Sequence, residues 1–575
     1  MIESLTVDRA VAVPLRDGTV LRADVYRPVG QRCPALIFRT PYDRTGLGMY
    51  GTFALRAASE GYAVVMQDTR GRGASEGEFT PFVHEREDGY DTVDWAASQP
   101  WCDGTAGMFG GSYDGVTQWQ AAMSGHPALK AIAPNVTASS YHHGWVYRGG
   151  AFQLGFSLGW TLSLAAHNAG RDPSVPASVR EALIDASDGF PDTARVLPLA
   201  DHPYLDKVAP YYQEWLRHPE YDEYWERLDV SRAYSDMTVA AFNMGGWYDT
   251  FLGGTLANYA GMAARSPVPD RQRLLVGPWP HEGLFRSNPV GSMSFGGRST
   301  AGALDVEGLQ LRWFDRWLRD ADVEDPPVLL YTMGANRWRV ADSWPLPGTE
   351  HQDWYLHSGG RANTLDGDGR LSREAPGDQP PDSYVYNPRN PVPTLGGALC
   401  CSPVHTQGGV YDQRPVEARE DVLVYTSEPL TQPLDVTGPV TVVLHAATTA
   451  VDTDWTAKLV DVGPCGYAQN ICDGIVRARY RGGAPQPVTP GEVVEYRIDL
   501  GATSTVFRPG HRIRVEVSSS NFPHFDRNPN TGEQPGTSSA MISAMQTVHH
   551  GGPALSRIVL PVVPAEATRP YGTES

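Results

Sequence analysis

The sequence has few cysteines, no long apolar run and no leader-like start. Its six cysteines include no CxxC pair, so neither a zinc ribbon nor a CxxC redox site is expected. No stretch reaches the roughly 18 apolar residues of a membrane span, and the first residues lack the basic and apolar regions of a signal peptide. We therefore expect a cytoplasmic protein. Cys400 and Cys401 are adjacent and could oxidise together, but two small buried residues are the interpretation we favour.

Basic residues are also in deficit. Lys and Arg number 47 against 66 for Asp and Glu, which gives a net charge of −19 at pH 7. Such a surface repels phosphate backbones and anionic lipid headgroups, so nucleic acid and membrane surfaces are not expected partners. The sequence leaves the oligomeric state open and allows a homodimer.

The distribution of strand and helix signals divides the 575 residues into three units. Residues 1–138 and 233–347 alternate short apolar strands, such as "CPALIFRT" and "RQRLLVGPW", with helical segments, which predicts a mostly parallel sheet covered by helices. Residues 139–232 lack strand signals and are rich in aromatics, so they are predicted to form a helical cap inserted into that α/β unit. Residues 348–575 carry regular β-rich runs between turns and predict a β jelly roll.

The most unusual short stretch is "MFGGSYDGVTQWQAAM", residues 108–123, in which small residues surround Ser112. An ordinary glycine-rich turn is one explanation. The other is a strained strand-to-helix turn that exposes a nucleophilic serine, as in α/β-hydrolases, where the two backbones nearly touch. A strand before Ser112 and a helix after it favour the second explanation. The usual G-x-S-x-G pattern is shifted, since Asp114 stands at the last glycine and Gly115 follows.

A nucleophilic serine needs a histidine base and a carboxylate that orients it. In an α/β-hydrolase these follow in the order acid then histidine, each in a loop after a strand. "TVAAFNMGGWYDTFLGG" delivers Asp249 after one apolar strand, and "RQRLLVGPWPHEGLF" delivers His281 after the next. Ser112, Asp249 and His281 are therefore the predicted catalytic triad.

Several blocks of the sequence resemble the cocaine esterase-like serine hydrolases, which belong with the X-Pro dipeptidyl-peptidase and α-amino-acid ester hydrolase superfamily. The blocks are "TPYDR", "QDTRGRGASEGEF", "GGSYDG", "GGWYDTFLGG", "VGPWPHEG" and, near the C-terminus, "AVDTDWTAKLVDV", "FRPGHRIRVEVSSSNFPHFDRNPNTG" and "GGPALSRIVLPVV". The likeness covers nearly the whole chain and is weakest across 139–232. In this family the nucleophile lies in G-x-S-Y-x-G, so the shifted glycine fits the family pattern.

The resemblance implies further site residues. Tyr42 would donate its hydroxyl to an oxyanion together with the backbone N–H of Tyr113, although Tyr42 could also be an ordinary aromatic beside a turn. Trp145, Trp160 and Phe251 would surround the acyl group, the alternative for both tryptophans being a place in the core of the cap. The resemblance implies no metal and no cofactor.

Together these features predict an α/β-hydrolase fold with a helical cap and a C-terminal jelly roll, acting on a small ester through an acyl-serine. An apolar or aromatic acyl group is expected. Cys400 and Cys401 replace large apolar residues of the cocaine-hydrolysing pattern, which predicts a wider pocket and a specificity shifted from cocaine.

Two alternatives remain. The first is an enzyme acting on amides or amino-acid esters: an X-Pro dipeptidyl peptidase, an α-amino-acid ester hydrolase or a β-lactam (cephalosporin) acylase. Such an enzyme would need carboxylates for a substrate ammonium, with Asp114 and Glu223 as candidates. The second, a catalytically inactive binding protein, is disfavoured because every triad position is occupied.

Overall fold

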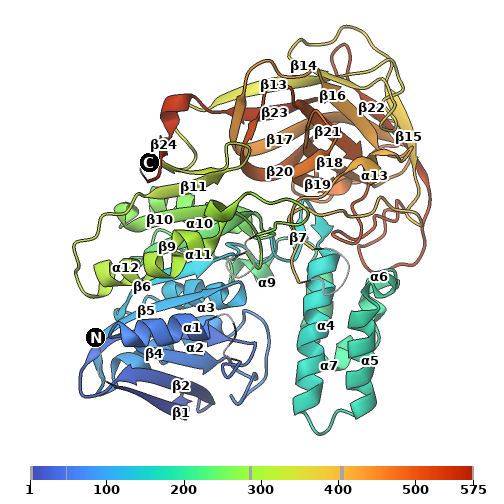
Figure 1. The fold of residues 1–575 in the computed structure, drawn as a ribbon. Helices are drawn as coiled ribbons and strands as arrows, with labels where there is room; N and C mark the ends of the chain where they lie inside the picture. Colours follow the sequence, from blue (N-terminus) through green and yellow to red (C-terminus); the bar gives the residue numbers. More distant parts are fainter. Residues whose placement is uncertain (1–3, 47, 49, 284–287, 402–406, 573–575) are drawn as a thin grey trace.

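The computed structural model describes residues 4–46, 48, 50–283, 288–401 and 407–572. Two large sheets organise them, one built mainly from the first 340 residues and one from the C-terminal part of the chain (Figure 1). A group of helices projects beside both sheets, coloured cyan to green in Figure 1.

The first sheet has the strand order β1-β2-β4-β3-β5-β6-β9-β10-β11-β12-β24. The first two strands and β12 pair antiparallel with their neighbours, whereas the central strands from β4 to β11 pair in parallel. The strands are β1 Leu5–Pro14, β2 Val20–Pro28, β3 Cys33–Thr40, β4 Ala63–Asp68, β5 Cys102–Gly111, β6 Leu129–Asn135, β9 Ala240–Tyr248, β10 Gln272–Pro280, β11 Val328–Thr332, β12 Arg337–Ala341 and β24 Arg569–Pro570.

Helices cover both faces of this sheet. In β3 the odd-numbered Ala35 and Ile37 belong to one hydrophobic core and the even-numbered Leu36 and Phe38 to another, because successive side chains of a strand point to opposite faces. The first core also contains residues of α2 and α3, and the second those of α1 and α12. These helices, with α10 and the short α11, are α1 Gly51–Ser59, α2 Glu85–Ala97, α3 Tyr113–Met123, α10 Leu252–Arg265, α11 Ala301–Leu304 and α12 Val306–Leu318.

Between β6 and β9 the chain leaves the sheet and forms mainly helices. They are α4 Leu154–Arg171, α5 Ala177–Asp188, α6 Phe190–Thr193, α7 Leu205–Val208, α8 Tyr211–Arg217 and α9 Glu223–Glu226. The expectation of a region without strands is corrected by a small hairpin, β7 Tyr147–Arg148 and β8 Ala151–Phe152. Gly149 and Gly150 connect the two strands with φ of 55° and 81°, a left-handed conformation that glycine adopts without strain.

The C-terminal region forms the second sheet, with the order β15-β22-β17-β23-β13-β14-β16-β21-β18-β19 and β20 paired with β17. Its elements are β13 Glu350–His357, β14 Arg370–Ser372, β15 Asp382–Tyr386, α13 Arg414–Glu417, β16 Leu423–Ser427, β17 Leu434–Thr448, β18 Asp454–Val462, β19 Ala468–Arg477, β20 Val494–Phe507, β21 Arg512–Ser518, β22 Ala544–His549 and β23 Arg557–Val562. Its core is separate from the two cores of the first sheet.

Buried polar contacts attach this sheet to the rest of the chain. The Asp526 carboxylate accepts hydrogen bonds from the backbone N–H of Phe152 at 2.9 Å and from the Arg477 guanidinium at 2.8 Å. The Tyr248 hydroxyl at the end of β9 donates to the backbone carbonyl of Asn470 at 3.0 Å. The chain end crosses back, since β24 pairs with β12 of the first sheet.

The structure confirms an α/β unit followed by a large β-rich region. The boundaries at 138, 232 and 347 stay predictions, although the last strand, β24, lies in the first sheet and not in the unit predicted for 348–575. Among the residues that the structure describes, no helix is both long enough and apolar enough to cross a membrane.

Candidate active site

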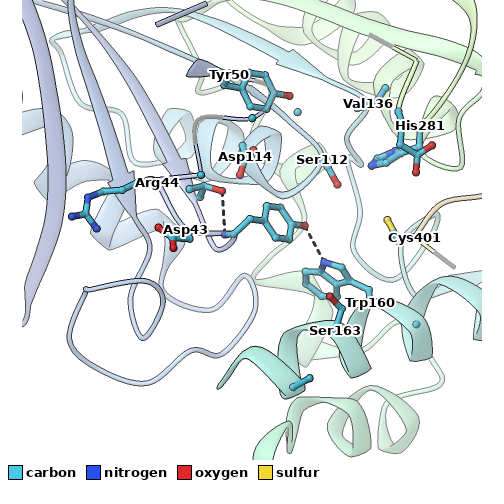
Figure 2. A pocket seen from close by; sticks show the side chains of 18 of the residues that line it. Asp43, Arg44, Tyr50, Ser112, Asp114, Val136, Trp160, Ser163, His281 and Cys401 are labelled. Atoms are coloured by element: carbon cyan, nitrogen blue, oxygen red, sulfur yellow. Dashed lines mark hydrogen bonds between the residues drawn. The ribbon is translucent and has the colours of Figure 1, made fainter. Parts of the chain in front are cut away.

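Ser112 occupies a strained turn between β5 and α3. Its backbone φ is 59° and its ψ is −123°, a left-handed conformation that costs a non-glycine residue roughly 1–3 kcal/mol and that the surrounding structure must enforce. Ser112 follows the last residue of β5 directly, and α3 begins at the next residue. The side chain therefore leaves the edge of the sheet and faces a cavity, where Figure 2 shows it opposite His281.

The glycines around Ser112 are required by close approaches between β5, α3 and β6. A Cβ on Gly111 would collide with the side-chain oxygens of Asn135 and Tyr50. A Cβ on Gly115, in the first turn of α3, would lie 2.7 Å from the Cβ of Thr137. The shifted glycine of the motif thus stands where the helix touches the neighbouring segment.

Hydrogen bonds from the end of β6 hold the turn. The N–H of Ser112 donates to the carbonyl of Asn135 at 2.9 Å, and the Thr137 hydroxyl donates to the carbonyl of Ser112 at 2.8 Å. The Gln118 amide also donates to the carbonyl of Gly110 at 2.9 Å. No local signal in the sequence distinguishes these supporting residues from other polar residues near a strand end.

Asp249 and His281 form a buried pair at the same edge of the sheet. Each follows the last residue of its strand, β9 or β10, and these strands are parallel neighbours. The Nδ1 atom of His281 lies 2.7 Å from Oδ1 of Asp249. Burial disfavours the charged imidazole, but the Asp249 carboxylate and this hydrogen bond outweigh it and raise the pKa of His281 above its ordinary value. The pairing leaves Nε2 as the ring nitrogen available for other partners.

A cavity of about 650 Å³ connects the predicted residues. Ser112, His281, Tyr42 and Trp160 all line it. No hydrogen bond joins the Ser112 hydroxyl to His281 within the described chain, as is common for catalytic pairs without substrate. The structure thus brings Ser112 and the Asp249–His281 pair to one cavity from three separate loops.

Tyr42 reaches this cavity from the loop after β3. Its hydroxyl oxygen accepts a hydrogen bond from the Trp160 indole N–H at 2.9 Å, so the Tyr42 O–H can still act as a donor. The Tyr42 side chain is 43% exposed, on the surface that lines the cavity. Desolvation in this recess, followed by the charge of Asp114, raises the pKa of Tyr42, so the hydroxyl keeps its proton at neutral pH.

Tyr113 presents its backbone N–H at the start of α3. As the first helical residue it has no carbonyl one turn earlier to accept that N–H. Its side chain is buried instead, and the phenol donates to Glu85 at 2.9 Å while accepting the N–H of Phe82 at 2.9 Å. The side chain therefore anchors α3 to the start of α2.

The three predicted acyl-group residues lie at different depths. Trp160 lines the cavity, whereas Trp145 and Phe251 are not among the residues that line it. Trp145 and Phe251 are buried and stacked on each other, with ring centroids 4.2 Å apart. Phe251 also packs edge-on against the His281 ring at 5.2 Å, so this aromatic layer supports the cavity wall from behind.

Asp114 is the buried carboxyl of the cavity wall. It is 3% exposed, and burial raises its pKa well above the ordinary value, with Glu85 adding to the shift. The raised pKa favours the uncharged carboxylic acid, which forms no ion pair with a cation. Asp43, Asp188 and Glu282 also line the cavity. Glu223, the other candidate for an ammonium, is exposed on α9 and does not line it.

The expectation that Cys400 and Cys401 are two small buried residues and not an oxidised pair is wrong about the oxidation. Their sulfurs form a disulfide, with the two Cα atoms 3.8 Å apart. Cys401 lines the cavity, and Figure 2 shows its sulfur on the same side as His281. Burial of Cys400 is confirmed. The loop turns both sulfurs toward each other at the cavity wall, which adjacency in the sequence could not reveal.

Two family models match consecutive parts of the chain. The model of the X-Pro dipeptidyl-peptidase (S15) family matches residues 17–283, and that of the X-Pro dipeptidyl-peptidase C-terminal non-catalytic domain matches residues 321–559. The first match contains the cavity residues from Tyr42 to His281.

Individual proteins resemble the chain over nearly its full length. A cocaine esterase from Rhodococcus sp. is 42% identical, and the alignment covers 96% of this chain and 98% of that protein. Among solved structures, an aminopeptidase from a marine sediment Thaumarchaeota archaeon has a TM-score of 0.83 at 29% identity, and an α-amino acid ester hydrolase has 0.80 at 26%. Each of these two comparisons covers 97% of both chains.

Proposed function

The chain belongs to the X-Pro dipeptidyl-peptidase (S15) family, in the branch that contains the cocaine esterase-like serine hydrolases, and we propose that it hydrolyses carboxylic esters through an acyl-serine intermediate. The observation that carries the proposal is the meeting of the strained Ser112 with the Asp249–His281 pair at one cavity. The substrate is a small molecule with an apolar or aromatic acyl group.

In the proposed reaction Ser112 Oγ attacks the ester carbonyl while His281 Nε2 takes its proton. The same nitrogen then returns the proton to the leaving alcohol, and a water repeats the sequence to release the acid. Asp249 holds Nδ1 protonated and stabilises the imidazolium that forms. No metal or cofactor takes part in this scheme.

The oxyanion of the tetrahedral intermediate would be bound by two donors, the Tyr42 hydroxyl and the Tyr113 backbone N–H. Trp160 occupies one lone pair of the Tyr42 oxygen and so orients the remaining proton. A neutral tyrosine is the required state, because a phenolate would repel the developing charge.

The two other regions have proposed roles of their own. Helices α4–α9 act as a cap, since α4 contributes Trp160 and Leu162 to the cavity and α5 contributes Ile184. A cap of this kind excludes water from the chemistry. The C-terminal sheet is a jelly roll in this proposal. The loop between β15 and α13 adds Cys401 to the cavity wall.

The lining favours an apolar acyl group. Phe38, Met66, Val136, Trp160 and Leu162 contribute apolar surface, and burial raises the pKa of Asp114, which favours its uncharged form. A second candidate function, hydrolysis of amino-acid esters or amides, is favoured by the carboxylates of Asp43, Asp188 and Glu282 at the same cavity and by the likeness to an α-amino acid ester hydrolase.

Substituting Ser112→Ala should lower kcat by about 10⁴–10⁶-fold, because it removes the nucleophile while the fold is kept. His281→Ala should cost a similar factor, and the double variant no more than either alone, since the two residues act as one unit. Hydrolysis of a p-nitrophenyl ester measures both. Ser163→Ala, at another serine of the cavity wall, is the matched control and should retain activity. Near-normal turnover by purified Ser112→Ala would refute the assignment.

Substituting Tyr42→Phe should lower kcat by about 10²–10³-fold, the usual contribution of one oxyanion donor. Tyr211→Phe is the control, because the Tyr211 hydroxyl is buried and does not line the cavity. Steady-state kinetics separate an effect of Tyr42→Phe on kcat from an effect on KM. A higher KM with unchanged kcat would mean that Tyr42 binds substrate and does not stabilise the oxyanion.

The pH dependence of kcat/KM should reflect the raised pKa of His281. The base must be neutral, so activity is lost as the pH falls through that pKa, and the midpoint should lie above the ordinary value of 6.5. Asp249→Asn should move the midpoint to lower pH and reduce kcat by about 10⁴-fold. Glu282→Gln removes a carboxylate with a weaker electrostatic effect on His281, so this variant should shift the midpoint less. An unchanged midpoint in Asp249→Asn would contradict the assigned pair.

A matched pair of substrates distinguishes the two candidate functions. We expect a phenylacetate ester to have a higher kcat/KM than the corresponding α-amino ester, because the apolar side chains of the cavity wall do not compensate a buried ammonium. If the amino ester is preferred by more than about tenfold, or ~1.4 kcal/mol, the enzyme is an α-amino-acid ester hydrolase instead. Xaa-Pro anilides and cephalosporin amides in the same assay test the amide alternatives.

A further inference from the structure

Three side chains with metal-ligand chemistry meet at the cavity wall. A ring nitrogen of His281 and the Sγ atoms of Cys400 and Cys401 all lie within 4.8 Å of one another. His281 comes from the end of β10, whereas the cysteines come from the loop that follows β15, so only the tertiary fold brings them together. His281 and Cys401 both line the cavity, and Figure 2 shows them side by side.

The His281 ring is oriented by a hydrogen bond in the way that is typical of metal-binding histidines. Metal-bound histidines generally donate their second ring N–H to a carboxylate, a backbone carbonyl or a water, which fixes the ring and makes the ligating nitrogen more basic. Asp249 does this at Nδ1 with a 2.7 Å contact, so Nε2 is the available ligand atom. The arrangement that suits proton transfer therefore also suits coordination.

The spacing and the donor set fit a soft divalent cation. With Zn–S near 2.3 Å and Zn–N near 2.0–2.1 Å, tetrahedral ligand atoms lie about 3.6 Å apart. After reduction the two sulfurs would therefore move apart, and the His281 nitrogen would approach them by roughly 1 Å. Two thiolates and one imidazole are a known zinc set, and they neutralise both charges of the ion. The fourth position would open into the cavity, where water can enter.

In this structure the two sulfurs are bonded to each other and cannot act as thiolates. We propose that reduction of the Cys400–Cys401 disulfide converts this wall into a binding site for a soft divalent cation such as Zn²⁺, which stops catalysis by occupying Nε2 of His281. The loss of catalysis rests on the proposed function, whereas the binding of the cation does not.

The chemistry balances with a small dithiol as the reductant. Exchange transfers two electrons and two protons to the cysteine pair, and the dithiol closes to its own cyclic disulfide. Cys401 is accessible from the cavity for this attack. The cation then displaces one proton from each thiol and takes the lone pair of His281 Nε2. That lone pair is the one needed for the Ser112 proton.

The first test compares the oxidised and the reduced wild-type protein. After treatment with a dithiol and its removal without air, Zn²⁺ is titrated while p-nitrophenyl ester hydrolysis is followed. Activity of the reduced protein should fall about tenfold or more near one equivalent of Zn²⁺ and return with a chelator. The oxidised protein should keep its activity over the same range. Mg²⁺, which prefers oxygen ligands, should inhibit neither form.

The second test detects the site without any activity. Cd²⁺ replaces Zn²⁺, and its thiolate charge-transfer absorption in the ultraviolet reports the bound ion. The reduced protein should bind one Cd²⁺ per chain, and Cys400→Ser/Cys401→Ser should abolish the signal. His281→Ala should weaken the affinity about tenfold or more, the cost of losing one ligand of three. Cys465→Ser is the matched control, because Cys465 is an exposed free cysteine outside the cavity lining.

Three results would overturn the proposal. Equal Zn²⁺ inhibition of the reduced protein and of Cys400→Ser/Cys401→Ser would place the ion on other ligands. Unchanged Cd²⁺ affinity in His281→Ala would remove His281 from the site. Binding of Cd²⁺ by the reduced protein without loss of ester hydrolysis would refute the effect on catalysis. If the protein hydrolyses no ester at all, the proposed function fails, and the Cd²⁺ titrations still decide the site.

Discussion

The close packing of β5, α3 and the end of β6 forces Ser112 into a left-handed backbone conformation, and the geometry of the site depends on that constraint. Gly111 and Gly115 allow the three segments to touch, and hydrogen bonds from Asn135 and Thr137 hold the turn in place. The conformational cost at Ser112 is met by this packing. A serine in an unstrained loop would bond to nearby backbone or water, whereas here its hydroxyl faces the cavity.

The remaining groups reach the cavity because parallel strands end at one edge of the sheet. Tyr42 follows β3, and Asp249 and His281 follow β9 and β10, which are direct neighbours. Trp160 approaches from α4 and Cys401 from the C-terminal region. Since the Asp526 contacts to Phe152 and Arg477 tie these regions together, the cavity requires all three parts of the chain to be folded against one another.

The electrostatics of the cavity follow from which carboxyls are paired. Asp249 is held against His281 and raises its pKa, whereas burial raises the pKa of Asp114, which no cation of the described residues pairs with. The Asp249 side chain thus lies where an imidazolium must be stabilised. Asp249 also orients the His281 ring so that Nε2 can bind a cation, which links the proposed catalysis to the proposed metal site.

The sequence by itself determined the features that depend on local sterics and on periodicity. Apolar runs such as Cys33–Thr40 predicted buried strands because both of their faces are covered, and the small residues around Ser112 predicted the strained turn because no Cβ fits there. Only the tertiary structure decided that Trp160 faces the cavity and supports Tyr42, that Trp145 and Phe251 lie behind it, and that Cys400 and Cys401 meet each other beside His281. These are contacts between segments far apart in the chain, and their geometry is set by packing that no local pattern encodes.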